Sequence, residues 1–307
     1  MTGQRQYLRA CKLIVASAGG SGLDLSGLHI KFAIKKADAQ TPNTAEIRVY
    51  NVAETTVARI RKEFSRVVLQ AGYETNLGVI FDGNIKQVRF GRENGVDTYI
   101  DIAAGDGDDA YNYAVVNTTL AAGASQRDQI NAAASPMSDR GVKPGYIGET
   151  GDTKLARGKV MYGMARDYMR QSAEASDTSW SIQDGKLQFV PNTGVLPNQA
   201  VVLNSKTGLV GMPEQTNDGI KARCLLNPML KIGGKVKINE KDVAQAKLAD
   251  TSKDAQANKP ADIAADGFYR LLVVEHSGDT RGNDWYSDLV CLDIDATQPP
   301  DKQVKKT

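Results

Sequence analysis

The sequence predicts a mainly β protein in which two small antiparallel β-barrel domains flank a mixed α and β region. Apolar and polar residues alternate with a period of two in the first and last thirds of the chain, whereas longer stretches of helical spacing lie between them. The 307 residues also exceed what one hydrophobic core usually fills. We therefore expect a first barrel with one packed helix at 1–105, an α+β insert at 106–206, a second barrel at 207–296 and a flexible tail at 297–307.

Period-two patterns indicate the strands of the first barrel. Residues 30–34 and 45–49 alternate between apolar and polar side chains, as half-buried strands do. Residues 84–90 and 96–103 are two further runs, joined by a short loop with a glycine at each end, which favours an antiparallel hairpin. Between these pairs, residues 57–64 place Val57, Ile60 and Phe64 on one helical face. We expect this helix to pack on the barrel.

The middle of the chain changes period. Residues 125–134 and 154–175 show helical spacing, and the pair Asp184-Gly185 between two apolar runs is a strong hairpin signal. Four residues of the second segment form a stripe, which we interpret as core filling in preference to a cofactor or partner groove: Met161, Met164, Ala165 and Tyr168.

The last third returns to strand patterns, at 220–226, 235–238, 268–276 and 285–294. The stretch 239–266 interrupts them and is rich in Ala, Lys, Asp and Gln, with no aromatic residue. Such a composition buries too little apolar surface to order itself, so we expect a mobile loop. Two interpretations stay open for it: a solvated loop without a role, and a contact with a neighbouring protein.

Charge and hydropathy limit the classes of partner. The chain has 38 Lys and Arg against 36 Asp and Glu, a formal net charge of +2, which provides no strong field to attract nucleic acid or a membrane surface. The apolar run 13–18 is too short for a signal peptide, and no run approaches the length of a membrane helix. We expect a soluble protein made in the cytoplasm, with no membrane-spanning segment.

The three cysteines, Cys11, Cys224 and Cys291, are odd in number and widely spaced, which argues against a disulfide framework and against a zinc site. Cys224 alternates with apolar residues of 220–226, so we interpret it as a small buried side chain on a strand. A reactive thiol is the minor alternative.

The spacing of the candidate catalytic residues matches no known catalytic motif. The two histidines, His29 and His276, lie on alternating strands outside known motifs. His276 precedes Ser277 and Asp279, but neighbouring residues of one strand project apart and cannot form a triad. The glycines of 19–22 lack the Lys and Ser or Thr of a phosphate-binding loop.

The sequence signals for a metal site and for a sugar site are equally weak. Asp106, Asp108 and Asp109 lack the downstream ligand of a calcium loop, so we interpret them as a turn with a helix cap. Trp180, Trp285 and Tyr286 are candidates for stacking on sugar, although aromatics beside hairpin turns more often brace a strand edge. The distance between two carboxylates, which would identify a glycosidase, cannot be read from the sequence. We therefore predict no catalytic residue, no cofactor and no metal ligand.

Several motifs, in their order and spacing, resemble the central hub proteins of phage tail baseplates. Pro-Asn-Thr-Ala-Glu-Ile-Arg-Val-Tyr-Asn at 42–51, with 71–73 and 80–83, resembles the first barrel of that family. The resemblance covers nearly the whole chain apart from the termini and 239–266. It continues through 158–166, 180–188, 207–213, 225–228 and 276–286.

The resemblance implies a hub in which two barrels per chain make six in a homotrimer, matching a sixfold tail tube to a threefold spike. Its implied partners are the tube protein, the spike, the tape-measure protein and the baseplate wedge proteins, with DNA passing through the ring. It implies a virion protein of a contractile tail, without catalysis. Two other hypotheses stay open: a phage-derived cell-wall or glycan-degrading enzyme, and a module that binds a host glycan.

Overall fold

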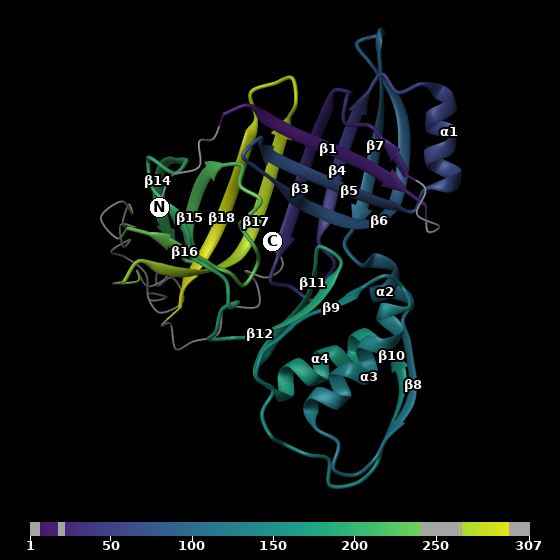
Figure 1. Ribbon diagram of the computed structural model, residues 1–307, viewed down its shortest axis with the longest axis vertical. Helices are drawn as coiled ribbons and strands as arrows, with labels where there is room; N and C mark the ends of the chain where they lie inside the picture. Colours follow the sequence, from purple (N-terminus) through teal and green to yellow (C-terminus); the bar gives the residue numbers. More distant parts are fainter. Residues whose placement is uncertain (1–6, 18–21, 240–242, 244–263, 265, 295–307) are drawn as a thin grey trace, which may run out of the picture.

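The computed structural model describes residues 7–17, 22–239, 243, 264 and 266–294. A large antiparallel sheet forms one part of the molecule, and a smaller α+β insert lies beside it (Figure 1). The predicted mobile loop 239–266, apart from its ends and Val243 and Ala264, lies outside the described residues. The predicted tail 297–307 and most of the glycine run 19–22 also lie outside them.

The N-terminal half of the sheet follows the predicted alternation. In β3, side chains at every second position are buried and the others face solvent, which is the burial pattern of a half-buried strand. Helix α1 buries Val57 and Ile60, as predicted. The elements of this half are β1 (Arg9–Ala16), β2 (Gly22–Asp24), β3 (Ile30–Ala37), β4 (Thr44–Tyr50), α1 (Glu54–Glu63), β5 (Arg66–Tyr73), β6 (Asn76–Glu93) and β7 (Asp97–Gly105).

The long strand β6 lets this half curl over itself. Its first part pairs with β5 and its second part with β7, with an irregularity between Ile85 and Gln87. Strands β1 and β5 consequently cross over β3, β4 and β7 (Figure 1). The first hydrophobic core contains inward side chains from both layers, among them Leu13, Leu69 and Ile47.

The C-terminal half has a core of its own. Cys224 and Cys291 are buried in it, as predicted for Cys224, and burial raises the pKa of the Cys224 thiol to about 12. The strands are β13 (Val201–Leu203), β14 (Leu209–Thr216), β15 (Gly219–Leu225), β16 (Lys235–Ile238), β17 (Phe268–Asp279) and β18 (Trp285–Asp293).

Strands β3 and β17 join the two halves edge to edge. Their antiparallel register runs from Val273 opposite Ala37 to Asp279 opposite Lys31. Trp285 of β18 reinforces the joint, because its ring is buried in the first core and its Nε1 donates to the Gly72 carbonyl at 3.1 Å.

The prediction of two small antiparallel β-barrel domains is therefore confirmed only in part, as a mainly β fold built on antiparallel pairing. The strands of the two halves make one 13-stranded sheet with the order β14-β15-β18-β17-β3-β4-β7-β6-β5-β1-β2, in which β16 also pairs with β17 and β13 pairs with β16. No closed barrel occurs in the part of the chain that the structure describes. Pairing between β3 and β17 uses the edge strands that would otherwise end each half. The sequence pattern of a strand does not show which strand it pairs with.

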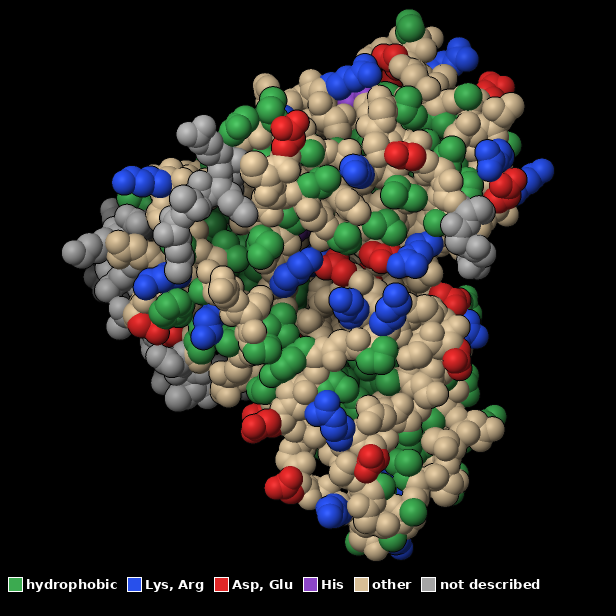
Figure 2. All heavy atoms as spheres, in the orientation of Figure 1, with side chains coloured by type: hydrophobic (Ala, Val, Ile, Leu, Met, Phe, Trp, Pro, Cys, Tyr) green, Lys and Arg blue, Asp and Glu red, His purple; other side chains and the backbone are tan. Residues whose placement is uncertain are grey.

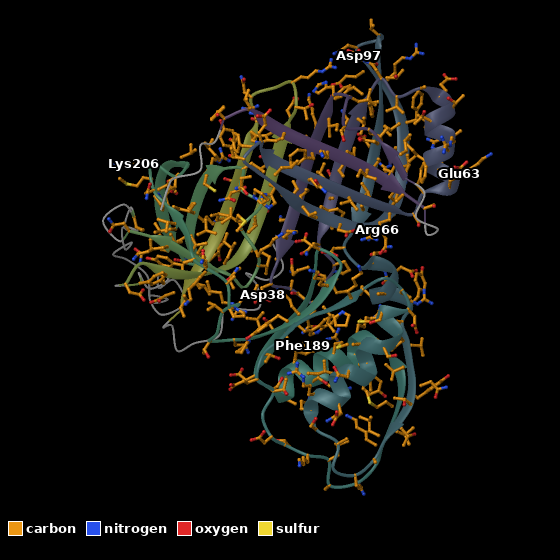
Figure 3. All side chains as sticks on the ribbon, viewed as in Figure 1. Asp38, Glu63, Arg66, Asp97, Phe189 and Lys206 are labelled. Carbon is orange, nitrogen blue, oxygen red and sulfur yellow. The ribbon has the colours of Figure 1, made fainter. Side chains whose placement is uncertain are left out.

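The insert places helices against two small sheets. Its core contains Trp180, Phe189 and Met161, and Figure 3 labels Phe189 within it. Strands β10 and β8 form one sheet, and β11, β12 and β9 form the other. The elements are α2 (Asp108–Tyr113), β8 (Val115–Leu120), α3 (Gln126–Ser138), β9 (Lys143–Ile147), β10 (Lys159–Met164), α4 (Ala165–Ala175), β11 (Thr178–Gln183) and β12 (Lys186–Pro191).

Two local predictions for the insert need correction. The helix expected over 154–175 begins only at Ala165, because 159–164 form strand β10, in which Met161 is buried between exposed neighbours. Gly163, with φ of +148°, is a poor helix residue, and β-branched and aromatic neighbours favour the strand. The Asp106 to Asp109 segment is a turn before α2, but the N-cap is Gly107, which has no side chain to cap the helix.

The hairpin prediction at Asp184-Gly185 is confirmed. Strands β11 and β12 pair in antiparallel register on either side of these two residues. Their φ angles of +53° and +73° match the left-handed turn that favours the Asp-Gly pair.

Gly278 tests how tightly the joint between the halves is packed. A Cβ at this position would lie 2.3 Å from Phe32 Cζ and 2.9 Å from Trp285 Cε3. We expect Gly278→Ala to lower the free energy of unfolding by about 1–3 kcal/mol, because both rings must shift. Gly27→Ala, where nothing lies within 4 Å of the added carbon, is the control and should change it little. Equal effects in chemical denaturation would contradict this packing.

Candidate functional site: a polar junction and an open sheet face

Polar side chains fill the border between the sheet and the insert. The three large hydrophobic cores are separate, and charged groups gather along this border (Figure 2). Two buried ion pairs dominate it, one around Asp38 and one around Asp184. Because buried charges require partners with defined geometry, such a border holds the insert in one orientation.

The first ion pair links three elements. Arg270 of β17 donates from Nη2 to Asp38 Oδ2 at 2.6 Å, and both side chains are almost completely buried. Ser179 of β11 donates to both oxygens of Asp38, at 2.8 and 2.9 Å. Arg270 also donates to the carbonyls of Pro191, Asn192 and Gly194, at the end of the insert. Asp38, labelled in Figure 3, follows directly after β3.

The second ion pair anchors the tip of the β11–β12 hairpin. Asp184 accepts from Lys36 of β3 and from Lys231 Nζ at 2.8 Å. Asp106 accepts the backbone N–H groups of Asp184 and Gly185 at 2.6 and 2.8 Å. Asn43 completes the contact by donating to the Ile182 carbonyl at 3.0 Å. The hairpin of the insert is thus held by residues of the first sheet half and by Lys231 of the second.

Burial and neighbouring charges shift the pKa values in opposite directions here. Burial raises the pKa of Asp106 to about 7. Burial also disfavours the charged form of Asp184, but Lys36 and Lys231 outweigh it and lower the pKa of Asp184 to about 2. Burial lowers the pKa of Lys36. Asp184 is therefore the firmly ionised centre of the cluster.

The open face of the sheet is a second candidate surface. Two hollows adjoin along it, one over β14, β15, β18 and β17 and one over β17, β3, β4, β7 and β6, and acidic side chains outnumber basic ones in their lining. Cross-strand ion pairs occupy this face: Lys35–Glu275 at 3.0 Å, Arg48–Asp101 at 2.7 Å and Arg223–Asp288 at 2.6 Å.

The comparisons with known proteins decide the family. A family model described as "Baseplate hub gp41" matches residues 14–241. The chain belongs to this family. It is a structural protein of the phage tail baseplate, and the resemblance in the sequence motifs is confirmed. None of the curated proteins matches the hub sequence.

Solved structures share the fold of the hub chain at low sequence identity. A tail protein from Neisseria meningitidis MC58 is 9% identical with a TM-score of 0.58, covering 97% of this chain and 98% of the other. The 43 kDa tail protein of prophage MuSo2 from Shewanella oneidensis is 8% identical with a TM-score of 0.57, covering 94% and 98%.

A third similar structure, the E. coli c3393 protein, is described as a type VI secretion component similar to the T4 tail proteins gp27 and gp5. It is 11% identical with a TM-score of 0.54, covering 90% of the hub chain and 74% of the other.

The candidate residues from the sequence do not converge on a catalytic site. His276 is buried with Nδ1 2.8 Å from Ser287 Oγ, whereas Asp279 lines the open face and contacts His29 Nε2 at 2.7 Å. Trp180 and Trp285 are fully buried, so neither is available to stack on sugar. Tyr286 of β18 is partly exposed, and the Arg223 guanidinium lies 5.6 Å from its ring centroid.

Metal ligands and membrane spans are also absent from the described residues. They include no cluster of three or more potential metal-ligating side chains, and the aspartates near α2 bind Lys86 and Arg140 instead. None of their helices is long and apolar enough to cross a bilayer.

Sequence reasoning missed the polar junction, although two signals pointed to it. Lys36 continues the inward-facing series of Ile30 and Ile34 in β3, and Arg270 interrupts an apolar run. A charged residue at an inward strand position requires a buried partner.

Asp184 tests the junction directly. We expect Asp184→Asn to lower the free energy of unfolding by about 3–5 kcal/mol, because the buried Lys36 and the partly exposed Lys231 lose their shared carboxylate. Asp152→Asn, at an exposed loop position, should have almost no effect. A loss below about 1 kcal/mol for Asp184→Asn in urea unfolding would show that the pair does not hold the insert.

The lowered pKa of His276 predicts how the stability of the fold depends on pH. Burial lowers its pKa from 6.5 to about 3 in the folded chain. The native state therefore binds fewer protons than the unfolded chain between these values, and its stability falls as pH falls through the window. His276→Asn should make this fall less steep in denaturation series across the same window. An unchanged slope would mean that His276 titrates normally.

Proposed function

We propose that the chain forms a homotrimeric ring at the centre of the baseplate, joining a sixfold tail tube to a threefold spike. The observation that carries the proposal is the β3–β17 pairing, which places two sheet halves side by side in one chain. Three copies then present six halves around the axis, so one ring offers both symmetries. We propose that the predicted units 1–105, 106–206 and 207–296 correspond to the first half, the insert and the second half, with β13 (Val201–Leu203) joining the second half from before its predicted boundary.

The ends of the sheet support closure of the ring. Strand β14 pairs only with β15, and the second part of β6 pairs only with β7, among the described strands. Open edges of this kind are aggregation hazards in a monomer and become pairing sites in an assembly. Val210 and Met212 of β14 are also exposed, at 38% and 63%. We propose that β14 of one copy meets the open part of β6 of the next.

The other partners follow from the resemblance. They are the tube protein, the spike, the tape-measure protein and the wedge proteins of a contractile tail, in a virion assembled in the host cytoplasm. DNA passes through the ring without a binding site of its own. The self-paired charges of the open sheet face favour such a passage, because each of its basic groups named above already has an acidic partner. We propose no catalytic role and no cofactor.

Met212 tests the proposed contact between copies. We expect Met212→Glu to weaken trimer formation at least about tenfold, because a charge at a strand edge opposes pairing and must be desolvated. Met229→Glu is a matched control, since Met229 is similarly exposed at 58% but lies in the loop after β15. Sedimentation of the purified proteins measures the difference. A wild-type chain that stays monomeric at every concentration would refute the ring.

A further inference from the structure

The insert carries a two-stranded ribbon with one open face. Strands β8 and β10 pair in antiparallel register from Val115 opposite Met164 to Leu120 opposite Lys159. Helices α3 and α4 pack against one side of the ribbon. On the other side Val160 and Tyr162 are 73% and 74% exposed, and Val115 is 48% exposed. Two-stranded ribbons gain stability mainly from what they pack against. An exposed apolar face on such a ribbon is therefore unusual.

The alternation of hydrogen-bonded and non-bonded pairs shows which backbone groups of β8 face outward. Ala165 donates its N–H to the Ala114 carbonyl at 2.9 Å, which makes this a bonded pair. Bonded and non-bonded pairs alternate along antiparallel strands. The pairs containing Val115, Asn117 and Thr119 are therefore non-bonded within the ribbon, and the N–H and C=O groups of these residues point to the free edge.

The opposite edge of the ribbon is closed by a side chain. Tyr162 of β10 donates its outward N–H to Tyr168 Oη at 2.8 Å, and this hydroxyl donates to the Tyr162 carbonyl at 3.3 Å. The tyrosine of α4 thus occupies the place that a further strand would take beside β10. Only β8 is left with an accessible edge.

Strand β8 also lacks the usual protection of an edge. Natural edges are blunted by Lys, Pro, bulges or very short strands. The sequence of β8 is Val-Val-Asn-Thr-Thr-Leu, with no charge, no proline and no irregularity in its register with β10. Its valines and threonines favour the strand conformation.

We propose that β8 accepts an extended segment of another tail protein as an added strand. The segment pairs its main chain with Val115, Asn117 and Thr119, and it presents uncharged β-branched or aromatic side chains to the apolar face formed by Val115, Val160 and Tyr162. The proposal rests on the hub ring described above, because it assigns the insert to contacts outside that ring.

Pairing of two β8 strands does not fit this edge. Antiparallel pairing of two β8 strands is a twofold contact, whereas a closed threefold ring contains only head-to-tail contacts. A six-residue edge is about 20 Å long, and one strand along it covers far less than the roughly 1,200 Å² of a stable independent interface. The occupant is therefore a segment of a protein that the same assembly already holds nearby.

Asn117 offers a sharp test in tail particles assembled with variant hub protein. Asn117→Pro removes one outward N–H and leaves the bonds to β10 intact, whereas Asn117→Ala keeps the N–H. Both purified variants should form the wild-type oligomer. We expect the proline variant to lower the yield of complete particles at least about tenfold and the alanine variant to preserve it. Equal yields would overturn the proposal.

A photo-crosslinker at Thr119 provides a second measurement that does not depend on the folding of the proline variant. In intact particles, p-benzoylphenylalanine at this position should join the hub to a different tail protein. Crosslinks to another hub copy, or none at all, would overturn the strand-addition proposal while leaving the ring intact. A wild-type hub that fails to form a trimer would instead refute the ring itself.

Discussion

The antiparallel pairing of β3 with β17 is the interaction on which the rest of the structure depends. It removes one open edge from each sheet half and makes a single surface from strands that are far apart in the sequence. Trp285 completes the joint by entering the core of the first half. The same strand β3 supplies Lys36, and Asp38 follows it, so the insert is anchored where the two halves meet. One pairing therefore sets the relative positions of all three parts.

The anchoring is polar for a physical reason. Apolar surfaces adapt to one another with little directional preference, whereas buried ion pairs and their hydrogen bonds are satisfied in one arrangement only. Buried pairs are weak evidence for stability, because desolvation opposes the attraction between the charges. Their contribution here is orientation. Asp106 and Lys231 hold the same hairpin tip from two directions, and Arg270 holds the base of the same hairpin through Ser179. A hub that must present the insert at a defined angle benefits from such a contact.

Much of the local structure could be predicted from the sequence, and most of the long-range arrangement could not. Period-two alternation predicted β3, β4, β15 and β18, and Asp184-Gly185 predicted its hairpin, because these signals act within a few residues. The stripe from Met161 to Tyr168 predicted one continuous helix, but only its second part lies in α4, since spacings of three and four also occur where a strand runs directly into a helix. Strand partners depend on residues that are distant in the chain, so alternation suggested two barrels where the structure has one sheet. The inward lysine of β3 was the visible sign of the polar junction.

The central claim is that one chain contributes two equivalent positions to a ring. Electron-microscopy images of the purified hub protein test it most directly. The account predicts particles with threefold symmetry and a pseudo-sixfold outline, in which each copy contributes two neighbouring sheet halves and the insert projects to one side. Monomers at all concentrations, or rings in which each copy occupies only one of six equivalent positions, would contradict it.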